Sequence, residues 1–227
     1  MNVKTTGAAA ACIVLLLSPA QLMPIGPAGA VDLNGKRLLV EAMSEDAKAG
    51  TSVPRTVEIA GTAGLVHWPT LPTVCAVNGA GAGLAMVFGP EPNRSGRIDC
   101  DPQRQGTGTG GSEGNSLRAL AATYRSTYGN AADTLALTGR MTIRESTKSP
   151  AETDDATTDV KQAITVRVAG AQCEVLDFVF EMTTQRKITR QSPRGRADAK
   201  TTASDTHERW TVPDRRRCTV LAPGAGR

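Results

Sequence analysis

The sequence predicts a mainly β protein, built as an antiparallel sandwich or split barrel and stapled by disulfides. Apolar and polar residues alternate along several segments, which is the pattern of strands with one buried face. Gly, Pro and Asn punctuate these segments at turn positions. An even number of cysteines stays in the chain once a predicted export signal is removed, which is typical of disulfides in an exported protein.

The first thirty residues predict export. Lys4 precedes an apolar run over 8–17, and Ala28-Gly29-Ala30 has the small-residue pattern of a signal-peptidase site. The run is too short to span a bilayer as a helix. We therefore expect a signal peptide over 1–30, cleaved near Ala30, and a periplasmic or extracellular mature chain without a transmembrane segment.

Four cysteines remain after the signal peptide, and they allow three pairings. We favour Cys75–Cys100 and Cys173–Cys218, because these loops are shorter and each pair lies in its own region. A metal site is not expected, since the chain has no C-x-x-C motif and only two histidines.

The mature chain divides into two β regions, over 31–100 and 116–227, which form one domain or two. Residues 101–115 between them are Gly-rich and poor in apolar side chains, so we expect a flexible loop. Three further polar stretches are predicted as loops: 44–54, 147–159 and 191–205.

Residues 116–128 are predicted as the one short helix. Leu117, Leu120, Tyr124 and Tyr128 recur at helical spacing, and Gly129 can end the helix. The Thr and Tyr residues of this segment favour β structure, which leaves a strand as the alternative.

The strongest predicted hairpin spans 164–183, with its turn at Ala169-Gly170. Alternation in its second strand assigns two faces. One carries Leu176, Phe178, Phe180 and Met182, and the other carries Cys173, Val175 and Val179. Asp177 and Glu181 interrupt the second face.

A Gly-rich stretch over 73–88 does not fit a nucleotide-binding fingerprint. Leu84 stands where the fingerprint needs a small residue, and no helix of useful length follows. A hairpin or bulge accounts better for these glycines, and no cofactor is predicted.

Positive charge collects in the C-terminal part of the chain. From Lys161 onward there are 13 basic and 7 acidic residues. This excess predicts a patch for an anionic surface or polysaccharide, with a solvated strand face as the alternative. Nucleic acid is not expected, because few aromatics accompany the charges. The candidate residues are Arg190, Arg194, Arg196, Arg215, Arg216 and Arg217.

We predict no catalytic residue, because the sequence offers no serine on a sharp strand-to-helix turn together with a histidine base. We therefore expect a non-enzymatic exported protein, a binding or envelope-associated module. The alternative is a secreted hydrolase that uses the carboxylates Asp177 and Glu181, or His207, as acid and base. Asp154, Asp155 and Asp159 offer oxygen ligands for Ca²⁺ but lack EF-hand spacing.

Overall fold

A computed structural model describes the chain from residue 30 onward with short gaps. The described residues are 30–46, 50–77, 80–105, 116–192 and 195–222. Side chains are not described at 46, 71–83, 100–105, 116–117, 191–192 and 195–199. The predicted signal peptide lies outside the described residues except for Ala30.

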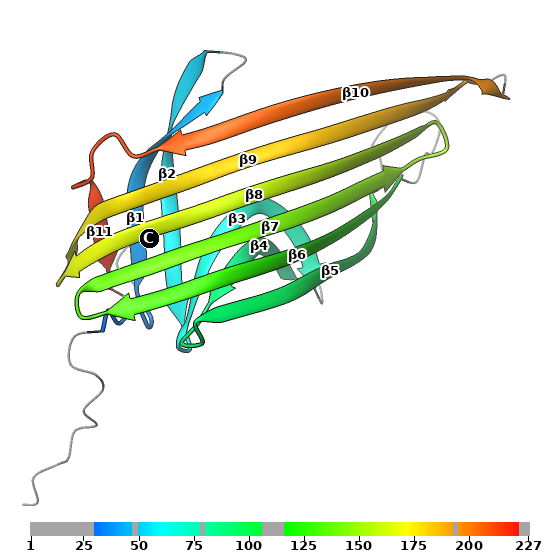
Figure 1. Ribbon diagram of the computed structural model, residues 1–227. Helices are drawn as coiled ribbons and strands as arrows, with labels where there is room; N and C mark the ends of the chain where they lie inside the picture. Colours follow the sequence, from blue (N-terminus) through cyan, green and yellow to red (C-terminus); the bar gives the residue numbers. More distant parts are fainter. Residues whose placement is uncertain (1–29, 47–49, 78–79, 106–115, 193–194, 223–227) are drawn as a thin grey trace, which may run out of the picture.

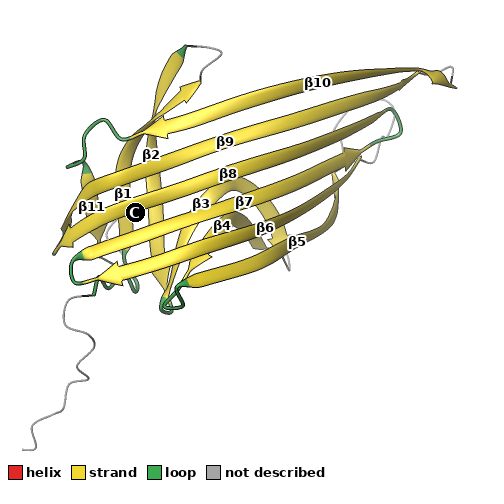
Figure 2. Ribbon diagram, in the orientation of Figure 1, coloured by secondary structure: helices red, strands yellow, loops and turns green. Residues whose placement is uncertain are grey.

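The described residues form eleven β-strands and no helix (Figure 2). The strands are β1 (Arg37–Asp46), β2 (Thr51–Thr62), β3 (Leu65–Val77), β4 (Ala80–Phe88), β5 (Asn93–Gln105), β6 (Ser116–Ala131), β7 (Thr134–Lys148), β8 (Glu152–Ala169), β9 (Gln172–Ser192), β10 (Gly195–Thr211) and β11 (Cys218–Leu221). The predicted β class is therefore confirmed, and so is the hairpin predicted over 73–88, which is formed by β3 and β4.

All the strands belong to one antiparallel sheet, in the order β4-β3-β2-β1-β10-β9-β8-β7-β6-β5. Strands that are adjacent in this order are also consecutive in the sequence, except at the seam where β1 lies beside β10. The short β11 pairs with both β1 and β9. β1 to β4 lie behind the long strands β5 to β9, so the sheet forms a small closed barrel with outer strands (Figure 1).

Apolar side chains fill the inside of the barrel. Burial alternates along β7 and β8, as expected for strands with one face on a core. The largest fully buried side chains come from both walls: Trp68, Phe88, Leu38, Ile59, Leu84, Met86, Leu135, Leu137, Met141 and Ile164. The interior is thus a packed core, which leaves the outer surface as the place for a ligand.

Polar side chains inside the barrel connect its two walls. Gln162 of β8 is fully buried; its Oε1 accepts a hydrogen bond from the Thr70 hydroxyl at 3.2 Å, and its Nε2 donates to the Pro69 carbonyl at 3.4 Å. Ser126 of β6 donates to the Val87 carbonyl at 2.6 Å. Every buried side-chain polar atom of the described residues has a partner, which satisfies the requirement for polar groups in a core.

The seam between β1 and β10 is held by a carboxylate. Glu208 accepts hydrogen bonds from the Ser44 hydroxyl at 2.5 Å and from the Trp210 indole at 2.6 Å. The Trp210 ring stacks on Phe180, with centroids 4.2 Å apart, and the Arg55 guanidinium lies 5.9 Å from its centroid. These contacts join the first strand of the chain to two of its last.

The predicted helix over 116–128 is wrong, because these residues belong to β6. They pair with β5 on one side and β7 on the other. Leu120, Ala122 and Ser126 are buried, at every second or fourth position, as a strand requires. Two strand partners satisfy the backbone along the whole segment, so tertiary pairing overrides the helical spacing of its large side chains.

The two faces predicted for β9 are also wrong in part. Thr165 pairs with Asp177 and Val166 with Val175, so Leu176 is an extra residue in a β-bulge. The bulge shifts the alternation by one position. Cys173, Val175 and Phe180 therefore all lie in the core, while Asp177 and Glu181 lie on the outer face.

The predicted pair Cys173–Cys218 is confirmed. The two residues are directly paired between β9 and β11, with Cα atoms 5.1 Å apart and the sulfurs bonded. The predicted pair Cys75–Cys100 falls on side chains outside the described part of the chain.

Two polar stretches predicted as loops, 147–159 and 191–205, are mostly strand in their described residues. β8 begins at Glu152, and β9 and β10 continue beyond the barrel as an arm. On its inner face Arg190 pairs with Glu152 at 2.9 Å, and Arg186 pairs with Asp154. The hydrogen bond from Arg186 lowers the pKa of Asp154. Ion pairs replace apolar contacts here, so the alternation that reveals a strand is missing.

Two other predicted loops are partly strand as well. The stretch over 44–54 contains the end of β1 and the start of β2, and the Gly-rich segment over 101–115 begins with the end of β5. Residues 47–49 and 106–115 lie outside the described part.

Replacement of Gly139 by Ala is expected to destabilise the protein by about 1–3 kcal/mol, the usual range for overpacking. Gly139 is buried in β7, and an added Cβ would lie 2.4 Å from the Met86 sulfur and 3.4 Å from Phe88 of the opposite wall. Urea unfolding measures the change. Gly129→Ala in β6 is the control, since its nearest contact would be an ordinary 3.6 Å; equal effects of the two would contradict this packing.

Candidate anion-binding site

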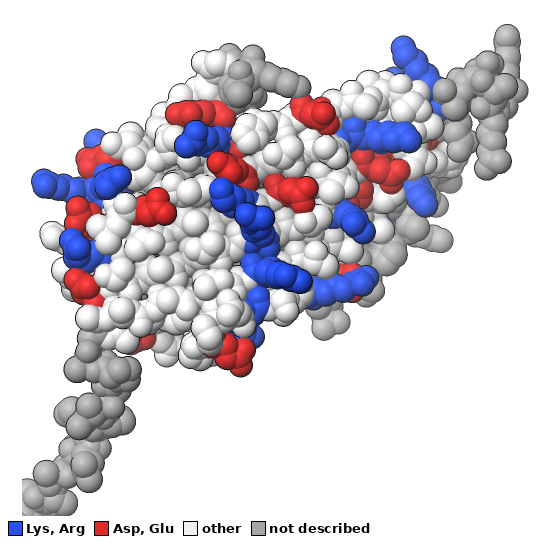
Figure 3. All heavy atoms as spheres, viewed as in Figure 1, with Lys and Arg blue, Asp and Glu red and all other residues white. Residues whose placement is uncertain are grey.

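One row of charged side chains crosses the outer face of the sheet. Consecutive paired positions on β6, β7, β8, β9, β10 and β1 are Arg125, Arg140, Lys161, Glu181, Arg209 and Glu45. The signs alternate from Lys161 to Glu45 but are all positive from Arg125 to Lys161. Figure 3 shows a continuous blue band where this row crosses β6 to β8. We call Arg125, Arg140 and Lys161 the basic row.

The basic row is poorly neutralised. Lys161 makes a 3.4 Å ion pair with Glu181. Among the described residues, neither the Arg125 nor the Arg140 side chain makes an ion pair or a hydrogen bond. Like charges at directly paired positions of a sheet are destabilising. The pairing of Arg125 with Arg140 therefore does not stabilise the fold.

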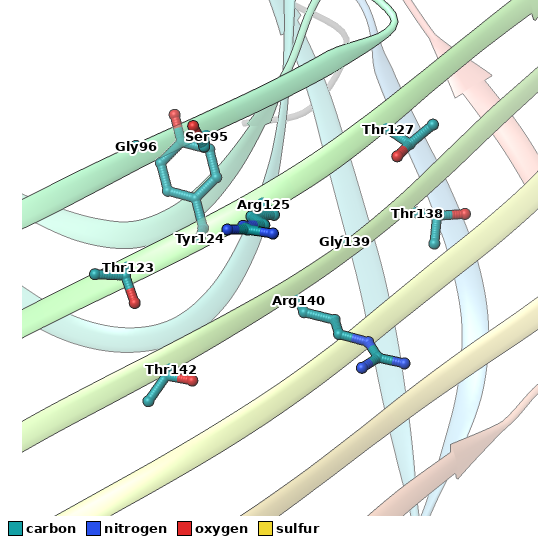
Figure 4. A pocket seen from close by; sticks show the side chains of 10 residues that line it. All are labelled: Ser95, Gly96, Thr123, Tyr124, Arg125, Thr127, Thr138, Gly139, Arg140 and Thr142. Atoms are coloured by element: carbon teal, nitrogen blue, oxygen red, sulfur yellow. The ribbon is translucent and has the colours of Figure 1, made fainter.

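The same short motif occurs on both strands at the centre of the row. Residues 123–127 read T-Y-R-S-T and residues 138–142 read T-G-R-M-T. Their antiparallel register sets Thr123 opposite Thr142 and Thr127 opposite Thr138, with the two arginines between. Figure 4 shows Arg125 and Arg140 between these two threonine pairs. The site thus has an approximate local two-fold axis between its arginines.

A hollow of about 640 Å³ lies along this motif, lined by side chains of β5, β6 and β7. Gly96 accommodates the Tyr124 ring at one end of the hollow, because a Cβ there would meet this ring at 2.4 Å. Of the flanking hydroxyls, Thr142 donates to Asp159 at 2.6 Å and Thr127 to Asn93 at 3.1 Å.

The chemistry of the hollow suits an oxyanion. A guanidinium offers several N–H donors in one plane, which match a carboxylate, sulfate or phosphate group. Threonine hydroxyls beside it can donate to and accept from a polar ligand. Guanidinium groups, which stay protonated, fit binding better than acid–base catalysis.

The structure does not bring the predicted arginine patch together. Arg190 lies near the outer end of β9 and pairs with Glu152, while Arg215, Arg216 and Arg217 lie in the loop before β11. That loop contacts the other end of β9, where Val175 donates to the Arg215 carbonyl at 2.8 Å. At about 3.3 Å per residue along β9, Arg190 lies roughly 50 Å from this loop. Arg194, and the side chain of Arg196, lie outside the described part.

Arg217 is already engaged in the loop. It pairs with Glu41 at 2.8 Å and with Asp214 at 3.5 Å, and the first of these contacts raises the pKa of its guanidinium. An exposed pair of this kind contributes little to stability, but it lowers the charge that the loop presents to a partner.

The residues considered for hydrolysis lie on the outer face of β9 and β10. His207 Nδ1 is 3.2 Å from the Thr183 hydroxyl, and Glu181 pairs with Lys161. Asp177 lies four positions from Glu181, near the bulge. His207 and Glu181 thus contact other residues and not each other. This geometry supports acid–base chemistry less well than the basic row supports anion binding.

The aspartates considered for Ca²⁺ are divided between two faces. Asp154 faces inward and pairs with Arg186, whereas Thr142 donates to Asp159 on the outer face. Within the described ranges, no cluster of three or more His, Cys, Asp or Glu side chains has a metal-binding arrangement. No helix in the same ranges is long and apolar enough to cross a membrane.

No protein-family model, no curated protein and no solved structure matches this chain. The basic row and its threonines therefore have to be interpreted from their own chemistry.

Sequence reasoning missed the basic row. Its members are 15 and 21 residues apart, and nothing in single-strand periodicity joins them. The signal that could have found the site is the repeated T-x-R-x-T motif, since two copies on paired strands bring their arginines face to face.

Proposed function

We propose that this protein is an exported, non-enzymatic binding module that recognises an anionic partner through the outer face of β6, β7 and β8. The observation that carries the proposal is the pair Arg125–Arg140, two exposed arginines at directly opposed positions, with no acidic residue at a position directly paired with either of them. A bound oxyanion would supply the missing negative charge, so ligand binding would relieve the repulsion that the free protein tolerates.

Replacement of Arg140 by Gln is expected to have two effects at once: weaker binding of the anionic partner and a more stable fold. Loss of one like charge from the row would raise the free energy of unfolding by about 0.2–1 kcal/mol. It would also lower the salt concentration that elutes the protein from heparin or from vesicles with anionic lipid, because exposed charge contacts are screened by salt. Urea unfolding and salt elution are the two measurements.

Arg144→Gln is the matched control for this experiment. Arg144 is exposed on the same face of β7, and its paired neighbours are the uncharged Ala121 and Thr157. The control removes the same net charge, so it separates the basic row from overall charge. Equal elution of the two variants would refute the site, and a lack of retention of the wild-type protein at low salt would refute the function.

A further inference from the structure

We infer that the ligand of the basic row is a linear acidic polysaccharide that lies across the strands, with one acidic sugar over each of β6, β7 and β8. This inference rests on the proposed function and names its ligand and its direction of binding. It is carried by the spacing of the cations, by the groups that flank them and by the charge that ends the row.

The spacing of the cations is set by the sheet. Neighbouring strands lie about 4.8 Å apart, so directly paired cations repeat at this interval perpendicular to the strands. Arg125, Arg140 and Lys161 occupy three successive positions. A linear chain of pyranoses advances by nearly the same length per sugar, so the acidic groups of a glycan with one carboxylate or sulfate on each sugar repeat along its axis at nearly the interval of the row.

The flanking groups favour a glycan over a membrane. Threonines on both sides of the arginines offer hydroxyls to the hydroxyls of a sugar, and they line the hollow along the row. Stable anchoring on a membrane takes an apolar element in addition to a basic patch. Of the described residues, the large hydrophobic side chain that is well exposed is Val53, which lies in β2 and not on this face.

The row also sets the length of the ligand. Glu181 is directly opposite Lys161 and would repel a fourth acidic group, while Ser95 opposite Arg125 adds no charge at the other end. The site therefore takes three acidic sugars. The approximate two-fold relation of the T-x-R-x-T motifs lets the central pair accept either direction of the glycan chain, and Lys161 extends the site on one side.

Oligogalacturonates of one to six sugars test this inference, since each sugar carries one carboxylate. Titration of the wild-type protein by calorimetry at low salt should give affinities that rise by ~1.4–5-fold for each added sugar, the gain of one exposed ion pair, and level off at three. Lys161→Gln should move the plateau to two sugars. Glu181→Gln should let a fourth sugar add affinity, and Arg144→Gln should leave the plateau at three.

The outcomes separate this inference from the function on which it rests. Affinity that climbs steadily to six sugars, or a plateau that Lys161→Gln does not move, would overturn the three-sugar site. Binding to vesicles with anionic lipid but not to any oligogalacturonate or to heparin would overturn the polysaccharide and keep the anionic partner. Absence of binding to all three probes would overturn both.

Discussion

A variant with Ala at both Cys173 and Cys218 is expected to lose about 4 kcal/mol of unfolding free energy. The disulfide closes a loop with a sequence separation of 45, and its removal restores the corresponding entropy to the unfolded chain. Folded domains are commonly stabilised by only 5–15 kcal/mol, so this change is a large share of the total. Urea unfolding of the two proteins at equal pH measures it.

The position of the bridge gives this prediction a second readout. Cys218 is the first residue of β11, a strand of four residues that pairs with β1 and β9. Without the bridge, β11 should separate from the sheet before the rest unfolds, so amide exchange at Thr219 and Val220 should accelerate. Unchanged exchange there, with an unchanged urea midpoint, would contradict a stabilising role.

Replacement of Trp68 by Ala is expected to cost about 3–5 kcal/mol, the usual range for deletion of a buried aromatic side chain. Trp68 is 1% exposed in β3, and its ring centroid lies 6.3 Å from that of Phe178 on the opposite wall. The deletion would leave a cavity between two walls that are held in place by other strands.

Trp68→Phe is the control for this cavity, since it keeps an aromatic ring at the same place and should lose clearly less. Urea midpoints rank the three proteins. A loss below about 1 kcal/mol for the Ala variant would mean that the core does not close around this side chain, in conflict with the buried position of Trp68.

The sequence could predict those strands that have one face in the core. In β8, Ile164 and Val166 are buried while Thr165 and Arg167 are not, and this alternation is visible without any structure. The helix predicted over 116–128 failed because its large side chains fit two periods. Leu120 and Tyr124 lie four apart, which is compatible with one helix face and equally with one strand face.

Two other features were beyond periodicity for physical reasons. None of the described side chains in the arm formed by the ends of β8, β9 and β10 belongs to the hydrophobic core, so its pairing depends on contacts such as Arg186–Asp154 and not on apolar alternation. The bulge at Leu176 changes which face a residue occupies without any mark in composition. Both depend on the partner strand, which single-strand reasoning does not include.

The candidate site shows the same limit. The excess of positive charge in the C-terminal part was visible in the sequence. Of the arginines selected from it, however, Arg190 lies near one end of β9, and Arg215 to Arg217 lie in a loop beside the other end. The basic row joins Arg125 and Arg140, outside the charge excess, to Lys161 at its first residue. Its existence depends on register, because a slip of one residue between β6 and β7 would move one arginine to the other face.

The seam between β1 and β10 has a consequence for biosynthesis. Ser44 and its partner Glu208 are separated by 164 residues, and at about 5–20 residues per second the ribosome needs roughly 8–33 s to make that length. Of the described strands that pair with β1, only β2 has been made during this interval, so the other edge of β1 is open. Charged and polar side chains such as Glu41 and Glu45 on that strand would then discourage pairing with other nascent chains. The last two strands to be synthesised, β10 and β11, thus fill the open edge of the first strand, β1.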